Sequence, residues 1–189
     1  MACIFESRMS YHRRNLPHLY PPGATLFLTW RLFGSLPRCA RPLLEADQNA
    51  GKAFALRDKQ LDRATVGPLW LKNPNVAKII VEALRRGAME FHLYDLLAWV
   101  VMPNHVHVVV TPRRPLPEIT RWLKGSTARS ANLLLGRMGK PFWQYESYDH
   151  CIRSEAELGR VIRYVERNPV AAGLVETIQD WPWSSATGS

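Results

Sequence analysis

Two histidines, His105 and His107, are the residues whose type and spacing could most directly do chemistry. They lie in residues 102–110, MPNHVHVVV, where β-branched residues follow a Pro-Asn turn signal. On a β-strand, residues i and i+2 share a face, with Cα atoms about 6.8 Å apart. Two imidazoles placed in this way can converge on one ion at about 2.1 Å, so the pair predicts a metal site. An isolated His-x-His also fits two histidines on a polar strand face, and that alternative stays open.

Two imidazoles do not complete a coordination sphere, so a further ligand must come from elsewhere. A helix expected to begin at the N-cap Ser154 and to run to about Arg167 carries Tyr164, and Asn168 follows on the same face four residues later. Tyr164 is a candidate nucleophile, because a metal-bound phosphate nearby would supply its electrophile. The alternatives are an ordinary core or surface tyrosine and, because Pro169 follows, an Asn168 that caps a new turn.

The elements that must position these residues follow the order strand, helix, strand, strand, helix, strand, helix. This order predicts an α+β, ferredoxin-like antiparallel sheet with helices packed on one face and the other face available. One helix should begin after Asn73 and stop at Gly87. The next should bury Leu133 and Leu134 among its apolar stripe. The expected strands are residues 24–33, 91–102, 105–111 and 142–153, and the expected helices are residues 74–87, 118–135 and 154–167.

A chain of 189 residues is long enough to bury a core, and we expect one domain over residues 1–189. Residues 1–23 contain several prolines and are predicted to form an irregular basic arm. Residues 34–66 form an insertion of unassigned role, with a weakly amphipathic segment at residues 50–63. Residues 176–189 form a C-terminal tail.

The net charge of +9 and the pI near 9.9, together with many aromatic residues, favour a polyanion partner, most commonly nucleic acid. Residues 112–140 hold seven basic residues against one acid. Contact with a phosphate backbone is the preferred interpretation of this stretch, and a solvated helix face is the alternative. The predicted DNA-binding residues are Arg13, Arg14, Arg113, Arg114, Arg121, Lys124 and Arg129.

Seven further segments, taken together, resemble the REP-associated tyrosine transposases, a branch of the HUH superfamily of single-strand endonucleases. They cover most of the chain from about residue 67 onward, in one order. The segments are GPLWL at 67–71, VMPNHVH at 101–107, LKGS at 123–126, PFWQ at 141–144, YDH at 148–150 with IR at 152–153, YVERNPV at 164–170 with AGLV at 172–175, and WPWSS at 181–185.

The resemblance implies a divalent metal, Mg²⁺ or Mn²⁺, held by His105 and His107, with Asn168 as a further ligand and Tyr164 as the nucleophile. It implies attack on a phosphodiester of single-stranded DNA, giving a 5′-phosphotyrosine and a free 3′-hydroxyl. The substrates of this family are repetitive extragenic palindromes (REP elements), which fold as hairpins. The implied function is therefore a metal-dependent DNA endonuclease and strand transferase, that is, a transposase.

Two other functions remain open from the sequence: a domesticated DNA hairpin-binding protein with little or no cleavage, and a metallohydrolase that would not need Tyr164. The chain has no stretch of roughly 20 apolar residues and no signal-peptide pattern, so we expect no membrane partner. We expect a cytoplasmic, nucleoid-associated bacterial protein, either monomer or homodimer.

Overall fold

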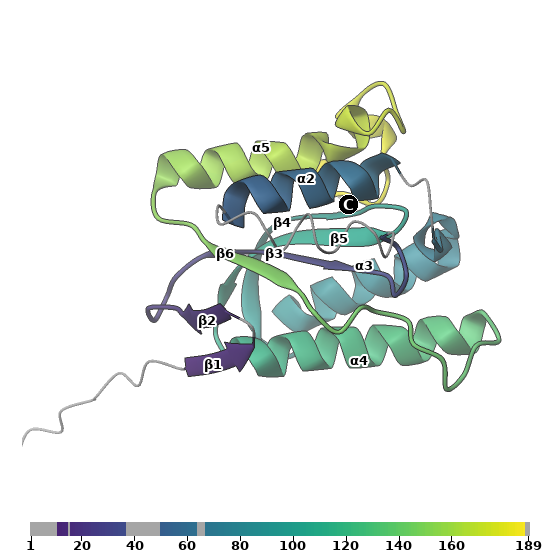
Figure 1. Ribbon diagram of the computed structural model, residues 1–189, viewed down its shortest axis with the longest axis horizontal. Helices are drawn as coiled ribbons and strands as arrows, with labels where there is room; N and C mark the ends of the chain where they lie inside the picture. Colours follow the sequence, from purple (N-terminus) through teal and green to yellow (C-terminus); the bar gives the residue numbers. More distant parts are fainter. Residues whose placement is uncertain (1–10, 15, 37–49, 64–66, 188–189) are drawn as a thin grey trace, which may run out of the picture.

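The computed structural model describes residues 11–14, 16–36, 50–63 and 67–187. A four-stranded sheet lies at its centre, with strand order β4-β5-β3-β6 and every neighbouring pair antiparallel (Figure 1). Its strands are β3 (Leu26–Arg31), β4 (Tyr94–Val101), β5 (His105–Pro112) and β6 (Tyr148–Cys151). The strand order is that of a ferredoxin-like sheet, so the predicted α+β class and antiparallel sheet are confirmed.

In the described residues, four α-helices surround this sheet: α2 (Ala50–Arg63), α3 (Pro74–Met89), α4 (Leu116–Leu134) and α5 (Glu155–Ala171). Helices α3 and α4 cover one face (Figure 1). The prediction that the helices pack on one face and leave the other available is wrong, because α5 and, beside it, α2 from the insertion cover the second face (Figure 1). Among the described residues, no helix combines the length and apolarity that crossing a lipid bilayer requires.

Strand β5 supplies side chains to both faces because its residues alternate. Val106, Val108 and Val110 join the apolar core under α3 and α4. His105, His107 and Val109 point to the opposite face, where Val109 packs in a smaller apolar cluster with residues of α5. The strand hairpin predicted around Pro103 and Asn104 is therefore confirmed, and its register sends both histidines to the α2 and α5 side.

Helix α3 begins as predicted, since the Asn73 side chain accepts a hydrogen bond from the Asn75 backbone N–H at 3.0 Å. The prediction that Gly87 stops this helix is wrong, because α3 continues to Met89. Gly87 is needed for close packing: a Cβ there would collide with the Tyr94 hydroxyl and lie 2.8 Å from the ring carbon Cζ. The Tyr94 hydroxyl donates to the Leu84 carbonyl at 2.8 Å, which fixes the ring against the helix.

Helix α4 buries a different stripe from the one expected. Ile119, Leu123 and Ala131 are buried, at a spacing of four or eight residues. Leu133 and Leu134 are 69% and 48% exposed, so their predicted burial is wrong. Leu133 lies two positions beyond Ala131, about 200° around a helix with 3.6 residues per turn, and Leu134 is the last residue of the helix.

Helix α5 begins at the predicted cap, where the Ser154 hydroxyl accepts from the Glu157 N–H at 3.2 Å. The prediction that it ends near Arg167 is wrong, because α5 runs through Asn168 and Pro169 to Ala171. Pro169 removes one backbone donor, which normally disfavours a helix interior. Both Asn168 and Pro169 are buried, so tertiary packing outweighs that loss and keeps Asn168 on the helix face that carries Tyr164.

The N-terminal region also differs from expectation. Strands β1 (Tyr11–Arg14) and β2 (Leu16–Leu19) pair antiparallel, so these residues are not irregular as expected, and residues 1–10 lie outside the described part of the chain. At the other end, the tail extends the free edge of β4: the Val101 N–H donates to the Trp183 carbonyl at 2.8 Å, and Trp181 Nε1 donates to the Val101 carbonyl at 3.0 Å.

Candidate metal site and nucleophile

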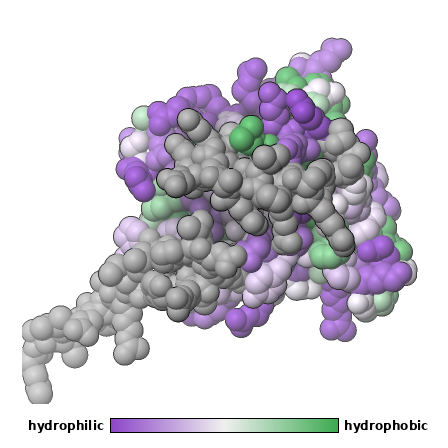
Figure 2. All heavy atoms as spheres, in the orientation of Figure 1, coloured by the Kyte–Doolittle hydropathy of each residue, from purple (hydrophilic) through white to green (hydrophobic). Residues whose placement is uncertain are grey.

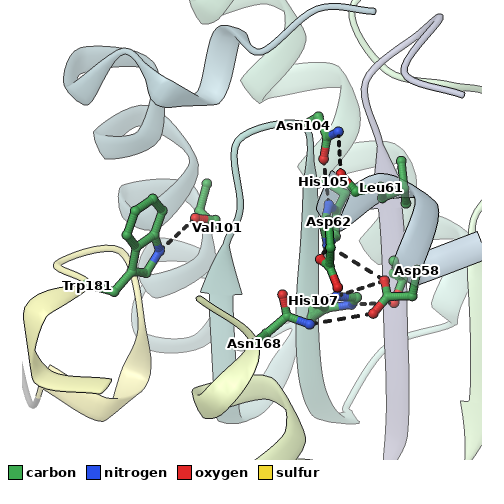
Figure 3. Close-up of polar contacts among 10 residues, drawn as sticks. Asp58, Leu61, Asp62, Val101, Asn104, His105, His107, Asn168 and Trp181 are labelled. Atoms are coloured by element: carbon green, nitrogen blue, oxygen red, sulfur yellow. Dashed lines mark hydrogen bonds and ion pairs between the residues drawn. The ribbon is translucent and has the colours of Figure 1, made fainter. Parts of the chain in front are cut away.

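The two histidines are fully buried and their Nε2 atoms lie 3.0 Å apart, so both rings face one point (Figure 3). Their other nitrogens are held from behind. His105 Nδ1 lies 2.7 Å from Asn104 Oδ1, and His107 Nδ1 lies 2.7 Å from the Thr29 hydroxyl. Outer partners of this kind fix ring orientation in metal sites.

The hydrogen bonds also fix the tautomer of His105. Asn104 Nδ2 donates to the Leu61 carbonyl at 2.9 Å, which turns its Oδ1 toward His105 Nδ1. An amide oxygen only accepts, so His105 Nδ1 carries the proton and Nε2 keeps its lone pair. The imidazole thus presents a ligand atom to the point it shares with His107.

Helix α2 adds carboxylates that the sequence analysis did not select. Asp58 Oδ1 lies 3.2 Å from His107 Nε2 and 3.7 Å from His105 Nε2, and Asp62 Oδ1 lies 3.8 Å from His105 Nε2 (Figure 3). Ligand atoms of Asp58, His105 and His107 all lie within 4.8 Å of one another. The sequence signal was two aspartates four residues apart in an amphipathic segment, which is also common on solvent-facing helices.

Asn168 joins this group, as its position after Tyr164 predicted. Its Nδ2 donates to Asp58 Oδ2 at 3.5 Å, and the Asn168 side chain is 2% exposed. Within the described residues, Asn168 Oδ1, Asp58 Oδ1 and Asp62 Oδ1 are buried without a hydrogen-bond partner. Buried polar atoms normally have partners. Three unsatisfied oxygens beside two imidazoles fit a divalent cation, for which oxygen and imidazole are suitable ligands.

The electrostatics keep the site in a metal-binding protonation state. Burial, reinforced by His107 and opposed by Asp58, lowers the pKa of His105 to about 3. Burial would raise the pKa of Asp58, but His107, with help from His105 and Asn168, outweighs it and leaves that pKa below its ordinary value. Burial and the Asp58 charge raise the pKa of Asp62 to about 7. At neutral pH, therefore, the His105 imidazole is neutral and Asp58 is ionised.

Tyr164 lies at the edge of this group, one turn before Asn168 on α5. Its ring centroid is 5.8 Å from that of His107 and 6.0 Å from that of Phe27, and the residue is 39% exposed. The structure thus brings together all four residues predicted from the sequence as the metal and nucleophile site, with Tyr164 as the one that water reaches.

The predicted DNA-binding residues lie elsewhere. Helix α4 follows β5 in the chain but packs on the opposite face from the His105 and His107 side chains, so the expected basic helix beside the site is not there. Lys124 Nζ donates to the Gln144 and Tyr145 carbonyls, both at 2.7 Å, and so holds the loop before β6.

The remaining predicted cations differ in exposure and partners. Arg113 is exposed and paired with Asp95, with 2.6 Å between Nη2 and Oδ1. Arg114, Arg121 and Arg129 are exposed. Arg13 and Arg14 belong to β1, and their side chains lie outside the described part of the chain. These residues stay predictions as DNA contacts.

Sequence reasoning passed over the arginines that flank the tyrosine. Arg160, Arg163 and Arg167 are exposed on α5, within four residues of Tyr164 on either side. Hydrophilic side chains gather along the upper edge of the molecule in Figure 2, where Figure 1 places α5. A search for basic residues at helical spacing around Tyr164, rather than a count of charge along the chain, would have found these arginines.

Comparison with known proteins agrees with the site. The sequence model of the family described as "Transposase IS200 like" matches residues 70–168, just over half of the chain. The chain is 31% identical over 99 residues to the REP-associated tyrosine transposase of Escherichia coli (strain K12), covering 49% of this chain and 54% of that protein. It is 27% identical over 111 residues to a putative REP-associated tyrosine transposase of Haemophilus influenzae (strain ATCC 51907 / DSM 11121 / KW20 / Rd), covering 51% and 61%.

The matched region therefore spans a little over half the length of these two relatives. Among solved structures, a REP-associated tyrosine transposase bound to a REP hairpin superposes with a TM-score of 0.59 at 21% identity, over 95% of this chain and 84% of that chain. At this identity the superposition supports the fold.

Proposed function

Because the chain belongs to the IS200-like transposase family, we propose that it is a metal-dependent single-strand DNA endonuclease and strand transferase. It acts on REP-type hairpin DNA through a 5′-phosphotyrosine intermediate. The observation that carries the proposal is the position of Tyr164 on α5, with its ring 5.8 Å from His107 at the edge of the buried donor group. A tyrosine without a phosphate-activating site beside it would be a poor nucleophile, because its ordinary pKa is about 10.

The proposed reaction exchanges one phosphate ester bond for another. The Tyr164 oxygen loses its proton and bonds to phosphorus, the bond from phosphorus to the 3′ oxygen breaks, and that oxygen leaves as a hydroxyl. The DNA on the 3′ side of the break stays on the tyrosine through its 5′ phosphate. A 3′-hydroxyl of another strand reverses the sequence and releases Tyr164, so no nucleotide cofactor is needed. A bound Mg²⁺ or Mn²⁺ would withdraw electron density from the phosphate.

Each side chain of the site has a defined role in this reaction. His105, His107 and Asn168 would hold the cation, Asn104 and Thr29 orient the two imidazoles, and the arginines of α5 would attract the phosphates on either side of the attacked one.

The substrate class rests on the comparisons. Two curated relatives are named as REP-associated tyrosine transposases, and the structure that superposes on this chain holds a REP hairpin. We propose the same hairpin class for this chain, with the exposed cations on the hairpin backbone and aromatic side chains on unpaired bases. Such a reaction belongs in the cytoplasm, where the chromosome lies.

The test is formation of a covalent complex. End-labelled hairpin DNA with a single-stranded foot is incubated with the protein and Mn²⁺ and run on a denaturing gel. We expect a protein–DNA adduct that chelation of the metal prevents and that Tyr164→Phe abolishes, with hairpin binding by gel shift unchanged within about twofold. Tyr145→Phe is the matched control, since Tyr145 is 72% exposed and makes no ring contact with His107 among the contacts described.

The rival functions give different results. Binding without any adduct identifies a hairpin-binding protein, and cleavage that survives Tyr164→Phe identifies a hydrolase that activates water. Either result would overturn the proposal.

A further inference from the structure

Helix α2 places an acidic side chain into the site from outside the region that defines the family. The family match begins at residue 70, whereas Asp58 and Asp62 lie twelve and eight residues before it. Asp58 nevertheless lies 3% exposed, against the two histidines of β5 and Asn168 of α5 (Figure 3). The insertion therefore supplies part of the site's interior.

Hydrogen bonds among the described residues leave one carboxylate oxygen of Asp58, Oδ1, without a donor. His105 Nε2 has no proton to give, because its Nδ1 proton is used on Asn104. A proton on His107 Nε2 could point to His105 Nε2 at 3.0 Å or to Asp58 Oδ1 at 3.2 Å, but not well to both. Asp58 Oδ1 makes no hydrogen bond of acceptable geometry with any described residue. Burying an ionised carboxylate this way costs several kcal/mol unless a positive group balances it.

A divalent cation would satisfy every one of these atoms together. The two Nε2 lone pairs and Asp58 Oδ1 face one another within 4.8 Å, and Asn168, which holds the second Asp58 oxygen at 3.5 Å, leaves its own Oδ1 unpartnered beside them. A carboxylate adds a full negative charge to a set that would otherwise be neutral, which raises affinity for a hard cation.

We infer that Asp58 is a ligand of the divalent cation held by His105 and His107, and that the bound cation fastens helix α2 over the site. The inference rests on the proposed function for the presence of the cation. It adds a ligand that is supplied by the insertion, and it gives residues 50–63 a role. Because the ligands come from β5 and α2, the energy of cation binding also stabilises the docking of α2 on the sheet.

Two apolar side chains also hold α2 in its docked position. Phe54, one turn before Asp58, stacks on Tyr148 with ring centroids 4.2 Å apart and lies 5.4 Å from Phe27, edge to face. Leu61 is 2% exposed, and its carbonyl accepts from Asn104 Nδ2 at 2.9 Å. Metal-free α2 would be held by these contacts, and metal-bound α2 by the contacts and the cation together.

The experiment measures cation binding without DNA. The full chain is stripped with a chelator and titrated with Mn²⁺, with affinity read by calorimetry and by the rise in the unfolding temperature. Loss of an outer-shell partner weakens metal binding by up to about 100-fold. Because Asp58 is a direct ligand in this inference, we expect Asp58→Asn to weaken Mn²⁺ binding at least that much. Asp62→Asn, the same change one turn later on α2, should weaken it only about threefold, as a charge that is near but not coordinated.

A second readout follows the helix itself. Hydrogen exchange of residues 54–63 should slow when Mn²⁺ is added to the wild type, and should not respond in Asp58→Asn. Far-UV circular dichroism and the metal-free unfolding temperature establish that each variant is folded.

Asp58→Asn binding Mn²⁺ as tightly as the wild type would overturn the inference, and so would a wild type that binds no Mn²⁺. The failure is distinct from failure of the proposed function. Loss of the Tyr164 adduct with Asp58-dependent Mn²⁺ binding intact removes the function only, whereas an adduct without Asp58-dependent binding removes the inference only.

Discussion

The two faces of the central sheet bury different kinds of side chain, although the same strands form both. Under α3 and α4, β5 contributes Val106, Val108 and Val110 to a continuous apolar core. His105 and His107 alternate with these valines along the strand, so they face the other way, toward α2 and α5. On that side lie buried side-chain oxygens that have no hydrogen-bond partners among the described residues. One strand therefore serves stability on one side and chemistry on the other.

The difference shows where stability is given up. Apolar burial contributes about 25 cal/mol per Å², and the α3 and α4 face relies mainly on it, with Thr127 and Asn132 as buried polar exceptions on α4. The opposite face interrupts its apolar cluster with buried polar groups, each of which costs free energy of folding unless it is satisfied. Sites of this kind are usually less stable than an apolar replacement and are kept for function.

The largest expected effect comes from making the site face resemble the other one. His107→Val replaces a fully buried imidazole with a residue that suits the strand and the apolar cluster beside it. We expect loss of the Mn²⁺-induced rise in unfolding temperature and at least about a 100-fold slower adduct formation. The metal-free unfolding temperature should fall at neutral pH, because His107 is the main group that offsets the burial of the Asp58 carboxylate.

Calorimetry of the metal-free and Mn²⁺-loaded protein measures both halves of that prediction. A variant that unfolds at or above the temperature of the metal-free wild type would show that His107 does not offset the burial of Asp58, and the electrostatic contrast between the faces would fail. Thr29, which contacts His107 Nδ1 at 2.7 Å, is left unpaired in the variant, so His107→Val with Thr29→Val is the matched control.

The second prediction concerns the apolar face. Leu28 is 1% exposed on β3, directly beside Thr29, and belongs to the core under α3 and α4. Leu28→Ala should lower the free energy of unfolding by about 2–5 kcal/mol, since the cavity cannot fully collapse. Urea denaturation measures the loss. Mn²⁺ affinity of the folded variant should stay within about twofold, and a larger change would show that the two faces are energetically coupled.

Much of this division was predictable from sequence. The alternation in residues 105–110 placed both histidines on one face, and the four-residue spacing placed Tyr164 and Asn168 on one side of a helix. Local patterns failed where a distant contact decides the outcome. Gly87 is typical of a helix stop, but the structure shows that it makes room for the Tyr94 ring. Pro169 is typical of a helix end, but it is buried inside a continuing helix.

The contribution of α2 lay furthest from prediction. Asp58 contacts His107 although 49 positions of the chain separate them. The sequence of a charged amphipathic segment does not distinguish an aspartate that faces a metal site from one that faces water. The connection between β3 and α3 could be recognised as an insertion, but the face of the sheet on which it would lie required the tertiary structure.

The third prediction tests whether α2 limits access. His105 and His107 have no exposed surface, so a DNA phosphate can reach them only if an element that covers them shifts, and α2 is one such element. Phe54→Ala removes the ring that stacks on Tyr148 and should loosen α2. We expect adduct formation at saturating hairpin to become about 3- to 10-fold faster, since a truncated aromatic anchor weakens the closed state by about 1 kcal/mol beyond its area. Single-turnover kinetics measures it.

Leu56→Ala is the control for that substitution, because Leu56 lies on the same helix and is 52% exposed. Unchanged hairpin affinity with a slower adduct in Phe54→Ala would show that docked α2 is required during attack, and would contradict a limiting role.

The smallest expected effect lies at the start of α5, where β6 meets the helix that carries Tyr164. Glu157 accepts from the Arg153 N–H at 2.7 Å and lies 2.8 Å from His150 Nε2. The Arg153 N–H, then the His150 contact, hold the pKa of Glu157 below its ordinary 4.5. A lowered carboxyl pKa stabilises the fold above pH 4.5, and that contribution disappears as pH falls through the folded-state pKa.

Glu157→Gln should therefore cost at most about 1 kcal/mol at pH 7, because water reaches both partners, and the difference from wild type should shrink as pH falls below 4.5. Urea denaturation from pH 7 down to pH 3 measures this narrowing gap. A gap that widens on acidification would mean that the protonated carboxyl is the favoured form in the fold. The start of α5 would then resemble the surroundings of Asp62, where burial raises the carboxyl pKa, and not an ordinary helix cap.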